Sequence, residues 1–129
     1  MKTRWITFLP LLAAILLARA PLLAHHGNGE YDEKNPITMK GTVTEFQWIN
    51  PHGQINFDVK DAKGNVTHWA CGTLSLGKLV RSGWTRHTLK PGDQITITLD
   101  PVRSGLPVGY LRKIVLADGT VMAIRDTPL

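Results

Sequence analysis

Apolar and polar residues alternate along most of the chain after residue 36, with the period of two that is typical of strands. The predicted strands are rich in β-branched and aromatic residues and cover 37–48, 54–60, 66–71, 94–102 and 110–117, with a short extension at 121–124. Turn residues gather in the clusters INPHG, DAKGN, KPGD and DGT. Gly41 interrupts the first strand, where we expect a bulge or a strong bend.

The segment 73–83 has a different period and predicts a short helix that stops at Gly83. Its apolar residues fall on one side of a helical turn: Leu74, Leu76, Leu79 and Val80. Three strands, a short helix and two further strands follow the order of an OB-type barrel. We therefore predict an all-β fold, a small OB-like five-stranded barrel with one short helix between strands three and four. The alternative, an immunoglobulin-type sandwich, fits the helix and the low strand count less well.

The first 24 residues have the pattern of an export signal. A basic start, Lys2 and Arg4, precedes an apolar stretch at 5–18 that is too short to span a bilayer and is followed by Arg19. Cleavage is expected after Ala24, because the alternative after Ala20 would leave a proline as the first residue. An uncleaved anchor is the other interpretation, and Arg19 argues against it.

The predicted organisation is therefore a signal peptide at 1–24, an extended polar arm at 25–36 and the barrel domain at 37–129. The expected location is periplasmic or secreted, with no membrane span after signal cleavage.

Charge and cysteine content narrow the classes of partner. The leader holds three of the 15 basic residues and none of the 10 acidic ones, so the remaining chain has a net charge of only +2. This near balance argues against a nucleic-acid partner.

Cys71 is the only cysteine, so the exported domain has no internal disulfide. We expect a buried apolar residue there; a metal-binding or redox thiol is the alternative.

Three histidines form the candidate metal site, His25, His26 and His52. Cleavage after Ala24 would give His25 two nitrogens, its free α-amine and its imidazole, which can chelate one ion. A third nitrogen from His52 or His26 would complete a set suited to Cu(II), so copper is the expected cofactor. The alternative is that the histidine pair is a polar stretch beside a cleavage site and that His52 only bonds backbone in its turn. His68 and His87 are expected to be surface residues.

Three tryptophans in the barrel domain are candidates for ligand stacking. Trp69 and Trp84 are expected to fill the core, whereas Trp48 precedes the Asn-Pro-His turn and is predicted to bind ligand together with Asn50. The serines lack a nucleophile motif, and Asp58 with Asp61 fits a solvated pair at a hairpin better than an acid/base dyad. No catalytic residue is predicted.

The combination of motifs resembles a family of small secreted bacterial proteins catalogued as a domain of unknown function. The shared motifs are the His25-His26 start, Tyr31-Asp32, the KGTV of 40–43, the WINPH of 48–52, Trp69-Ala70 and the segment 79–93 with its LVRSGW and LKPGD. The chain departs from the family at Gly27-Asn28, where Ser-Phe is usual, and near Cys71, where an acidic residue is frequent. The second departure puts a shared acidic ligand in doubt. The resemblance implies an exported barrel-like β domain and no particular activity.

Three functional hypotheses follow. The leading one is an exported, non-enzymatic ligand-binding module that holds copper or another transition metal through the mature N-terminal histidine. Its partner would be a small ligand, a metal ion or a periplasmic protein. The alternatives are a metal-free module that binds protein or glycan through sheet edges and Trp48, and an oxidative copper enzyme with a histidine brace.

Overall fold

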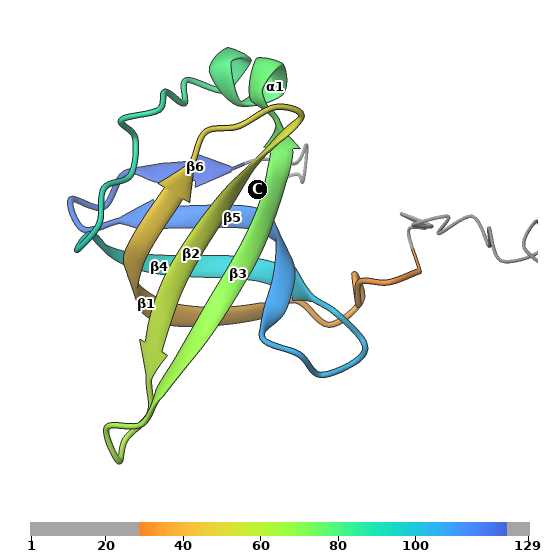
Figure 1. Cartoon of the computed structure of the whole chain (residues 1–129), viewed down its shortest axis with the longest axis vertical. Coiled ribbons are helices and arrows are strands. Elements are labelled where there is room, and N and C mark those ends of the chain that lie inside the picture. Colours follow the sequence, from red (N-terminus) through yellow and green to blue (C-terminus); the bar gives the residue numbers. More distant parts are fainter. Residues whose placement is uncertain (1–28, 124–129) are drawn as a thin grey trace, which may run out of the picture.

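The computed structural model describes residues 29–123 and shows a small β-barrel (Figure 1). Its elements are β1 (Ile37–Gln47), β2 (His52–Lys60), β3 (Val66–Ser75), α1 (Leu76–Arg81), β4 (Gln94–Pro101), β5 (Val108–Leu116) and β6 (Val121–Ala123). Within residues 29–123, no helix combines the length and the apolar character needed to cross a membrane.

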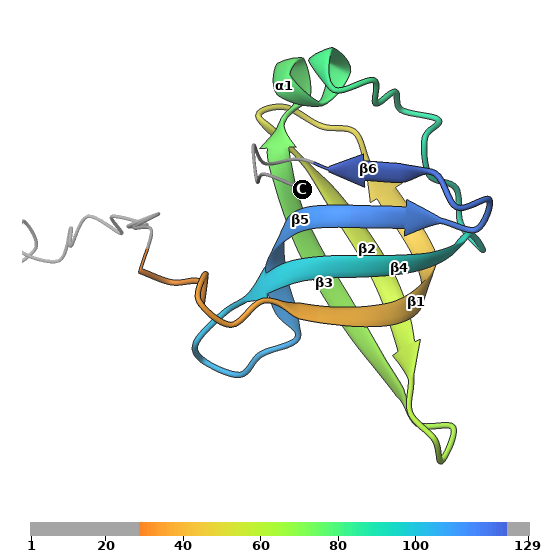
Figure 2. The same ribbon diagram turned by 180° about the vertical axis from the view of Figure 1, so that it is seen from behind.

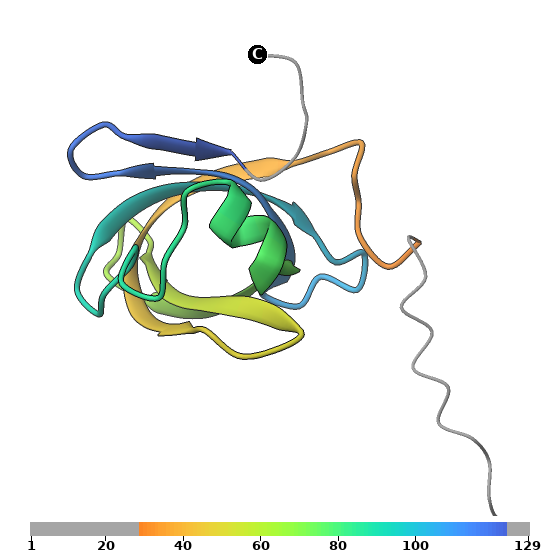
Figure 3. The same cartoon turned by 90° about the horizontal axis from the view of Figure 1, so that it is seen from above.

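Five strands close into a ring in the order β3-β2-β1-β4-β5. Neighbouring strands are antiparallel except at the closure, where Ala70 to Gly72 of β3 pair in parallel with Val108 to Tyr110 of β5. β6 pairs with β5 and lies outside the ring, and α1 lies across one opening of the barrel (Figure 3). The predicted OB-like five-stranded barrel, with a helix between strands three and four, is confirmed.

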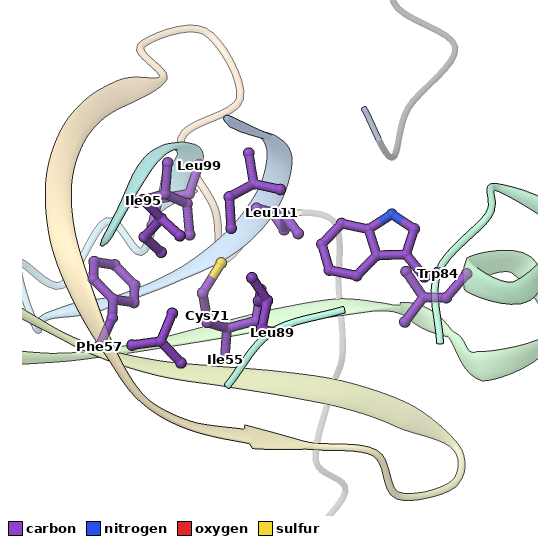
Figure 4. Packing of buried hydrophobic residues seen from close by; sticks show 12 residues of the cluster. Ile55, Phe57, Cys71, Trp84, Leu89, Ile95, Leu99 and Leu111 are labelled. Atoms are coloured by element: carbon purple, nitrogen blue, oxygen red, sulfur yellow. The ribbon is translucent and has the colours of Figure 1, made fainter. Parts of the chain in front are cut away.

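The core is built from the inward positions of the alternating strands. In β2, Ile55 and Phe57 are buried while Asn56 between them is partly exposed, as the period of two requires. Cys71 lies among these apolar side chains and is fully buried, as predicted (Figure 4). Each buried aliphatic or aromatic side chain contributes roughly 1.5–3 kcal/mol relative to exposure, so packing can stabilise a domain that has no disulfide.

The bulge predicted at Gly41 is wrong in position. The register between β1 and β2 shifts between Val43 and Glu45, and Gly41 itself pairs regularly with Ile95 of β4. Gly41 instead permits close packing, because a Cβ there would lie 2.7 Å from Cδ2 of Phe57. A single glycine within a strand is typical both of a bulge and of close packing by a neighbouring group, so the sequence alone did not distinguish the two.

The helix predicted for 73–83 is shorter than expected. Residues 73–75 still belong to β3, because the strand pairs with β2 as far as His52 opposite Ser75. Within α1, Leu79 is buried, whereas Val80 is 57% exposed rather than on the buried side. Gly83 has a φ of +85° just after the helix, in agreement with the predicted stop.

Candidate functional site

Only part of the predicted site lies within the described residues. His25 and His26 are outside the described residues. His52 is the exposed first residue of β2, at the end of the barrel that carries α1. Asn50 is exposed in the same β1–β2 turn, and Trp48 is partly buried with its ring edge-on to Phe46 at 5.7 Å.

A short arm before β1 is fastened along the end of β4. Figure 2 shows this arm leaving the side of the barrel beside the β4–β5 loop, away from α1. Its contacts are a β-bridge between Tyr31 and Val102, a bond from Asp32 N to the Pro101 carbonyl (2.8 Å), one from Arg103 N to the Glu30 carbonyl (3.0 Å) and one from Arg103 Nε to the Gly29 carbonyl (3.1 Å). The described start of the chain therefore has a defined position on the barrel.

An ion pair between Asp100 and Arg112 also binds the same arm. Asp100 is fully buried, and its Oδ1 accepts a hydrogen bond from Nε of Arg112. The guanidinium also donates from Nη2 to the backbone carbonyl of Glu33 in the arm. Arg112 is the extra residue of β5 at a bulge, because Thr98 pairs with Lys113 and Leu99 with Leu111. Sequence reasoning missed this pair, since an arginine in an alternating strand looks like a solvent-facing residue.

The Tyr31 side chain covers the junction between arm and barrel. Its ring lies 5.7 Å from that of Tyr110. Burial raises the pKa of the Tyr31 phenol, and the charge of Glu30 adds to this effect. The phenol therefore stays neutral where its ring packs beside Tyr110.

A groove of about 260 Å³ lies beside the β2–β3 ribbon and the start of β5. Its wall includes Trp69, which stacks on Phe57 with ring centroids 6.3 Å apart, and Pro107 of the β4–β5 loop. Asp58 and His68 also line it as cross-strand neighbours, with Asp58 Oδ1 2.6 Å from His68 Nδ1. The His68 side chain is 82% exposed, in agreement with its predicted surface position.

The ladder of hydrogen bonds places the base of the arm relative to β3. Tyr31 bridges Val102, Val102 donates its backbone N–H to the Val108 carbonyl, and Val108 pairs with Ala70 of β3. The base of the arm is therefore at the level of Ala70 along the barrel.

The predicted ligand His52 and the surface residue His68 lie on opposite sides of this level. His68 is two residues from Ala70 along β3, about 7 Å, whereas His52 lies opposite Ser75, five residues and about 17 Å in the other direction. His52 therefore lies well away from the level at which the arm joins the barrel.

Metal ligands within the described part of the chain are sparse. Residues 29–123 hold no group of three or more histidine, cysteine or acidic side chains gathered closely enough to bind an ion. Burial raises the pKa of the Cys71 thiol far above its ordinary value, so the thiol stays protonated and is a poor ligand.

Two solved structures share the fold. The mitochondrial single-stranded DNA binding protein Rim1 from S. cerevisiae matches with a TM-score of 0.50 at 9% identity, over 64% of this chain and 93% of that chain. The ZRD-deleted mutant of TiaS in complex with agmatine matches with a TM-score of 0.51 at 20% identity, over 72% of this chain. This chain spans only 27% of the TiaS chain. At these identities the similarity establishes the fold alone.

Sequence comparison gives the family. No curated protein matches the chain. The DUF6152 family, described as a family of unknown function, matches residues 14–111 and so confirms the resemblance to a domain of unknown function. Since that match covers about three quarters of its length, the chain belongs to the DUF6152 family.

Proposed function

We propose that this protein is an exported ligand-binding module that holds a transition metal, copper, at the start of its mature arm. The observation that supports this proposal is the fastening of the arm by Arg112, which joins the fully buried Asp100 to the Glu33 carbonyl. Burying an ion pair removes two charges from water and often adds little net stability. The contact between this ion pair and the backbone of the polar arm is therefore better explained as positioning the arm than as stabilising the fold.

The chemistry of the proposed site comes from the first residues after the signal. Cleavage after Ala24 makes His25 the N-terminal residue, so its α-amine and imidazole chelate one ion as a pair. The α-amine has a pKa of roughly 7.7–8.0, and a metal displaces its proton readily near neutral pH. Nitrogen ligands in this arrangement favour Cu(II) over harder ions. His25 is four residues from Gly29, the first described residue of the fastened arm.

The second candidate function is a metal-free module that binds glycan or protein. The groove favours it, because the outer face of strands two and three is where OB-type barrels bind extended ligands. Trp69 and Asn56 supply an aromatic ring and an amide there, as sugar recognition requires. Asp58 in the same wall, together with the small net charge, argues against a nucleic-acid ligand.

The test is a copper titration of the full chain exported by a bacterial host, after mass spectrometry has identified its first residue. The control is residues 25–129 made in the cytosol with a methionine retained before His25, which removes the free histidine amine. We expect tight binding by the exported protein alone. Equal and weak binding by both would reject the metal function and leave the groove as the ligand site.

A further inference from the structure

We propose that the outer face of β1 and β2 carries a binding site for an acidic sugar, which Lys40 and Lys60 hold between them. The site is independent of copper. It rests on the second candidate function, in which the groove beside Trp69 holds a glycan, and it names the chemical class of that glycan as one that contains a uronate.

The site lies in a hollow that opens where β1 and β2 separate. The ladder between the two strands ends at the pair Thr42 and Asp58. Beyond this pair, the first half of β1 lies against β4, while the β2–β3 hairpin projects from the barrel (Figure 1). The hollow has a volume of about 440 Å³, within the roughly 300–1,000 Å³ of small-molecule sites. Its wall is formed by residues of all four of these strands.

Two lysines occupy equivalent positions beside this opening. Lys40 and Lys60 each lie two residues beyond the last β1–β2 pair, so the period of two places them on the same face of the sheet. Both residues line the hollow. Like charges at facing positions on neighbouring strands repel each other. Within residues 29–123, neither lysine has an ion pair or a side-chain hydrogen bond that would offset this repulsion. An anion between the two ammonium groups would offset it.

A hydroxyl group beside the lysines adds a neutral donor. Gln94 donates from Nε2 to Thr42 Oγ1 (2.9 Å), which leaves the Thr42 hydroxyl to donate its own hydrogen. Both residues line the hollow. Two ammonium groups and one hydroxyl are therefore available to the oxygens of a carboxylate. Hydrogen bonds between charged partners are shorter and stronger than those between neutral groups.

Asp58 connects the hollow to the groove, because it lines both. Its Oδ1 lies 2.6 Å from Nδ1 of His68. A carboxylate accepts hydrogen bonds from sugar hydroxyls but repels an anion, so the groove suits a neutral sugar and the lysine hollow suits an acidic one. A uronate next to a neutral sugar has this pattern. A nucleic acid carries a phosphate at every residue and would place negative charge against Asp58 as well.

Apolar surface in both hollows favours a sugar over another kind of anion. Trp69 lines the groove, and Val66, whose side chain is exposed, lines the lysine hollow. The C–H faces of two neighbouring sugars can pack against these side chains while their hydroxyl and carboxylate groups bind the polar ones.

The experiment titrates the exported protein, kept free of copper by a chelator, with a tetrasaccharide of alternating glucuronate and N-acetylglucosamine. The comparison ligand is the same tetrasaccharide with its carboxylates reduced to alcohols. Changes in the NMR spectrum of the protein locate each ligand and give its affinity. We expect the acidic ligand to bind about 5-fold more tightly at low salt, and this difference to shrink at about 0.5 M salt because the charges are screened.

Lys40→Gln and Lys60→Gln should each weaken binding of the acidic ligand about 3-fold and leave that of the reduced ligand unchanged. Lys113→Gln is the matched control, because it removes the same charge from an exposed position on β5 that does not line the hollow. It should change neither affinity. Without ligand, the two hollow variants should melt no lower than the parent, since the repulsion between the lysines is relieved.

Equal affinity of the parent protein for the two ligands would overturn the acidic site while glycan binding in the groove stands. Tighter binding of a polyglutamate peptide through the same lysines would make the occupant an acidic peptide and overturn the sugar assignment. Binding of neither tetrasaccharide would overturn both the acidic site and the glycan function, and would leave the copper function to its own test.

Discussion

The carboxylate of Asp100, which is completely buried, accepts a hydrogen bond from Nε of Arg112 at the bulge in β5. The same guanidinium binds the Glu33 carbonyl, so one side chain connects the barrel interior to the N-terminal arm. A change at Arg112 should therefore affect both the stability of the barrel and the position of the arm.

Replacing Arg112 by alanine should lower the free energy of unfolding by about 3 kcal/mol, because it leaves the buried Asp100 carboxylate without its arginine. Urea unfolding followed by tryptophan fluorescence measures this loss. Arg103→Ala is the control, since its ion pair with Asp32 is long at 3.8 Å and solvent-exposed. It should change stability by less than about 1 kcal/mol. Similar losses in the two variants would show that burial of Asp100 does not matter.

Gly109 and Gly72 give a second matched pair, at the closure between β3 and β5. A Cβ on Gly109 would clash with the Leu99 side chain and lie 2.8 Å from the Asp100 carbonyl, whereas on Gly72 the nearest atom is 3.7 Å away. We expect Gly109→Ala to cost about 1–3 kcal/mol through overpacking and Gly72→Ala to be nearly neutral. Thermal unfolding of the two variants side by side tests this, and equal melting temperatures would contradict the close packing of β4 on β5.

Much of the fold follows from local pattern. The alternation in 54–60 predicted the inward Ile55 and Phe57, and the DAKGN cluster predicted the β2–β3 hairpin, because side-chain period and turn chemistry act within a few residues. The residue at which β3 ends did not follow from local pattern. Leu74 fits a helical face as well as a strand, and only pairing with β2, twenty residues earlier in the chain, extends β3 to Ser75.

The candidate site was less predictable for the same physical reason. His68 looked like one exposed strand histidine, and its partner Asp58 looked like a hairpin residue, until the register of β2 on β3 placed them opposite each other. The pairing of Asp100 with Arg112 depends on a bulge that shifts β5 by one residue against β4. Such relationships arise from three-dimensional register, which spacing in a single sequence does not encode.

The β2–β3 turn should give a measurable pH dependence of stability. Asn65 donates from its side chain and backbone to Asp61, with a further bond from Lys63 N, and these bonds lower the pKa of that carboxyl. A lowered folded-state pKa means that the stabilisation is present above the ordinary carboxyl range and is lost as the pH falls through the folded-state pKa.

Asp61→Ala should therefore lower the melting temperature at neutral pH, and its difference from the parent protein should shrink in acid. Asp61→Asn keeps an acceptor for the backbone N–H groups but has no titrating group there. The melting temperature of Asp61→Asn should lie between those of the parent and Asp61→Ala at neutral pH. In acid it should fall less than the melting temperature of the parent. Melting temperatures measured across this range check both expectations, and a gap between parent and Asp61→Ala that is independent of pH would contradict the role of the ionised carboxylate.

Cys71 offers a direct probe of whether the barrel is closed. Its thiol is buried in the core, where reagents do not reach it. Burial, and to a smaller extent the charge of Asp100, also raise the pKa of the thiol, so little reactive thiolate forms. A soluble disulfide reagent should modify the native protein at least on the order of a thousand times more slowly than the protein in urea, because reaction requires opening of the barrel. In Arg112→Ala the native rate should rise as stability falls, while in Arg103→Ala it should stay close to that of the parent. Rapid modification of the native parent protein would instead show that Cys71 is accessible, and would revive the interpretation of this cysteine as a metal-binding or redox thiol.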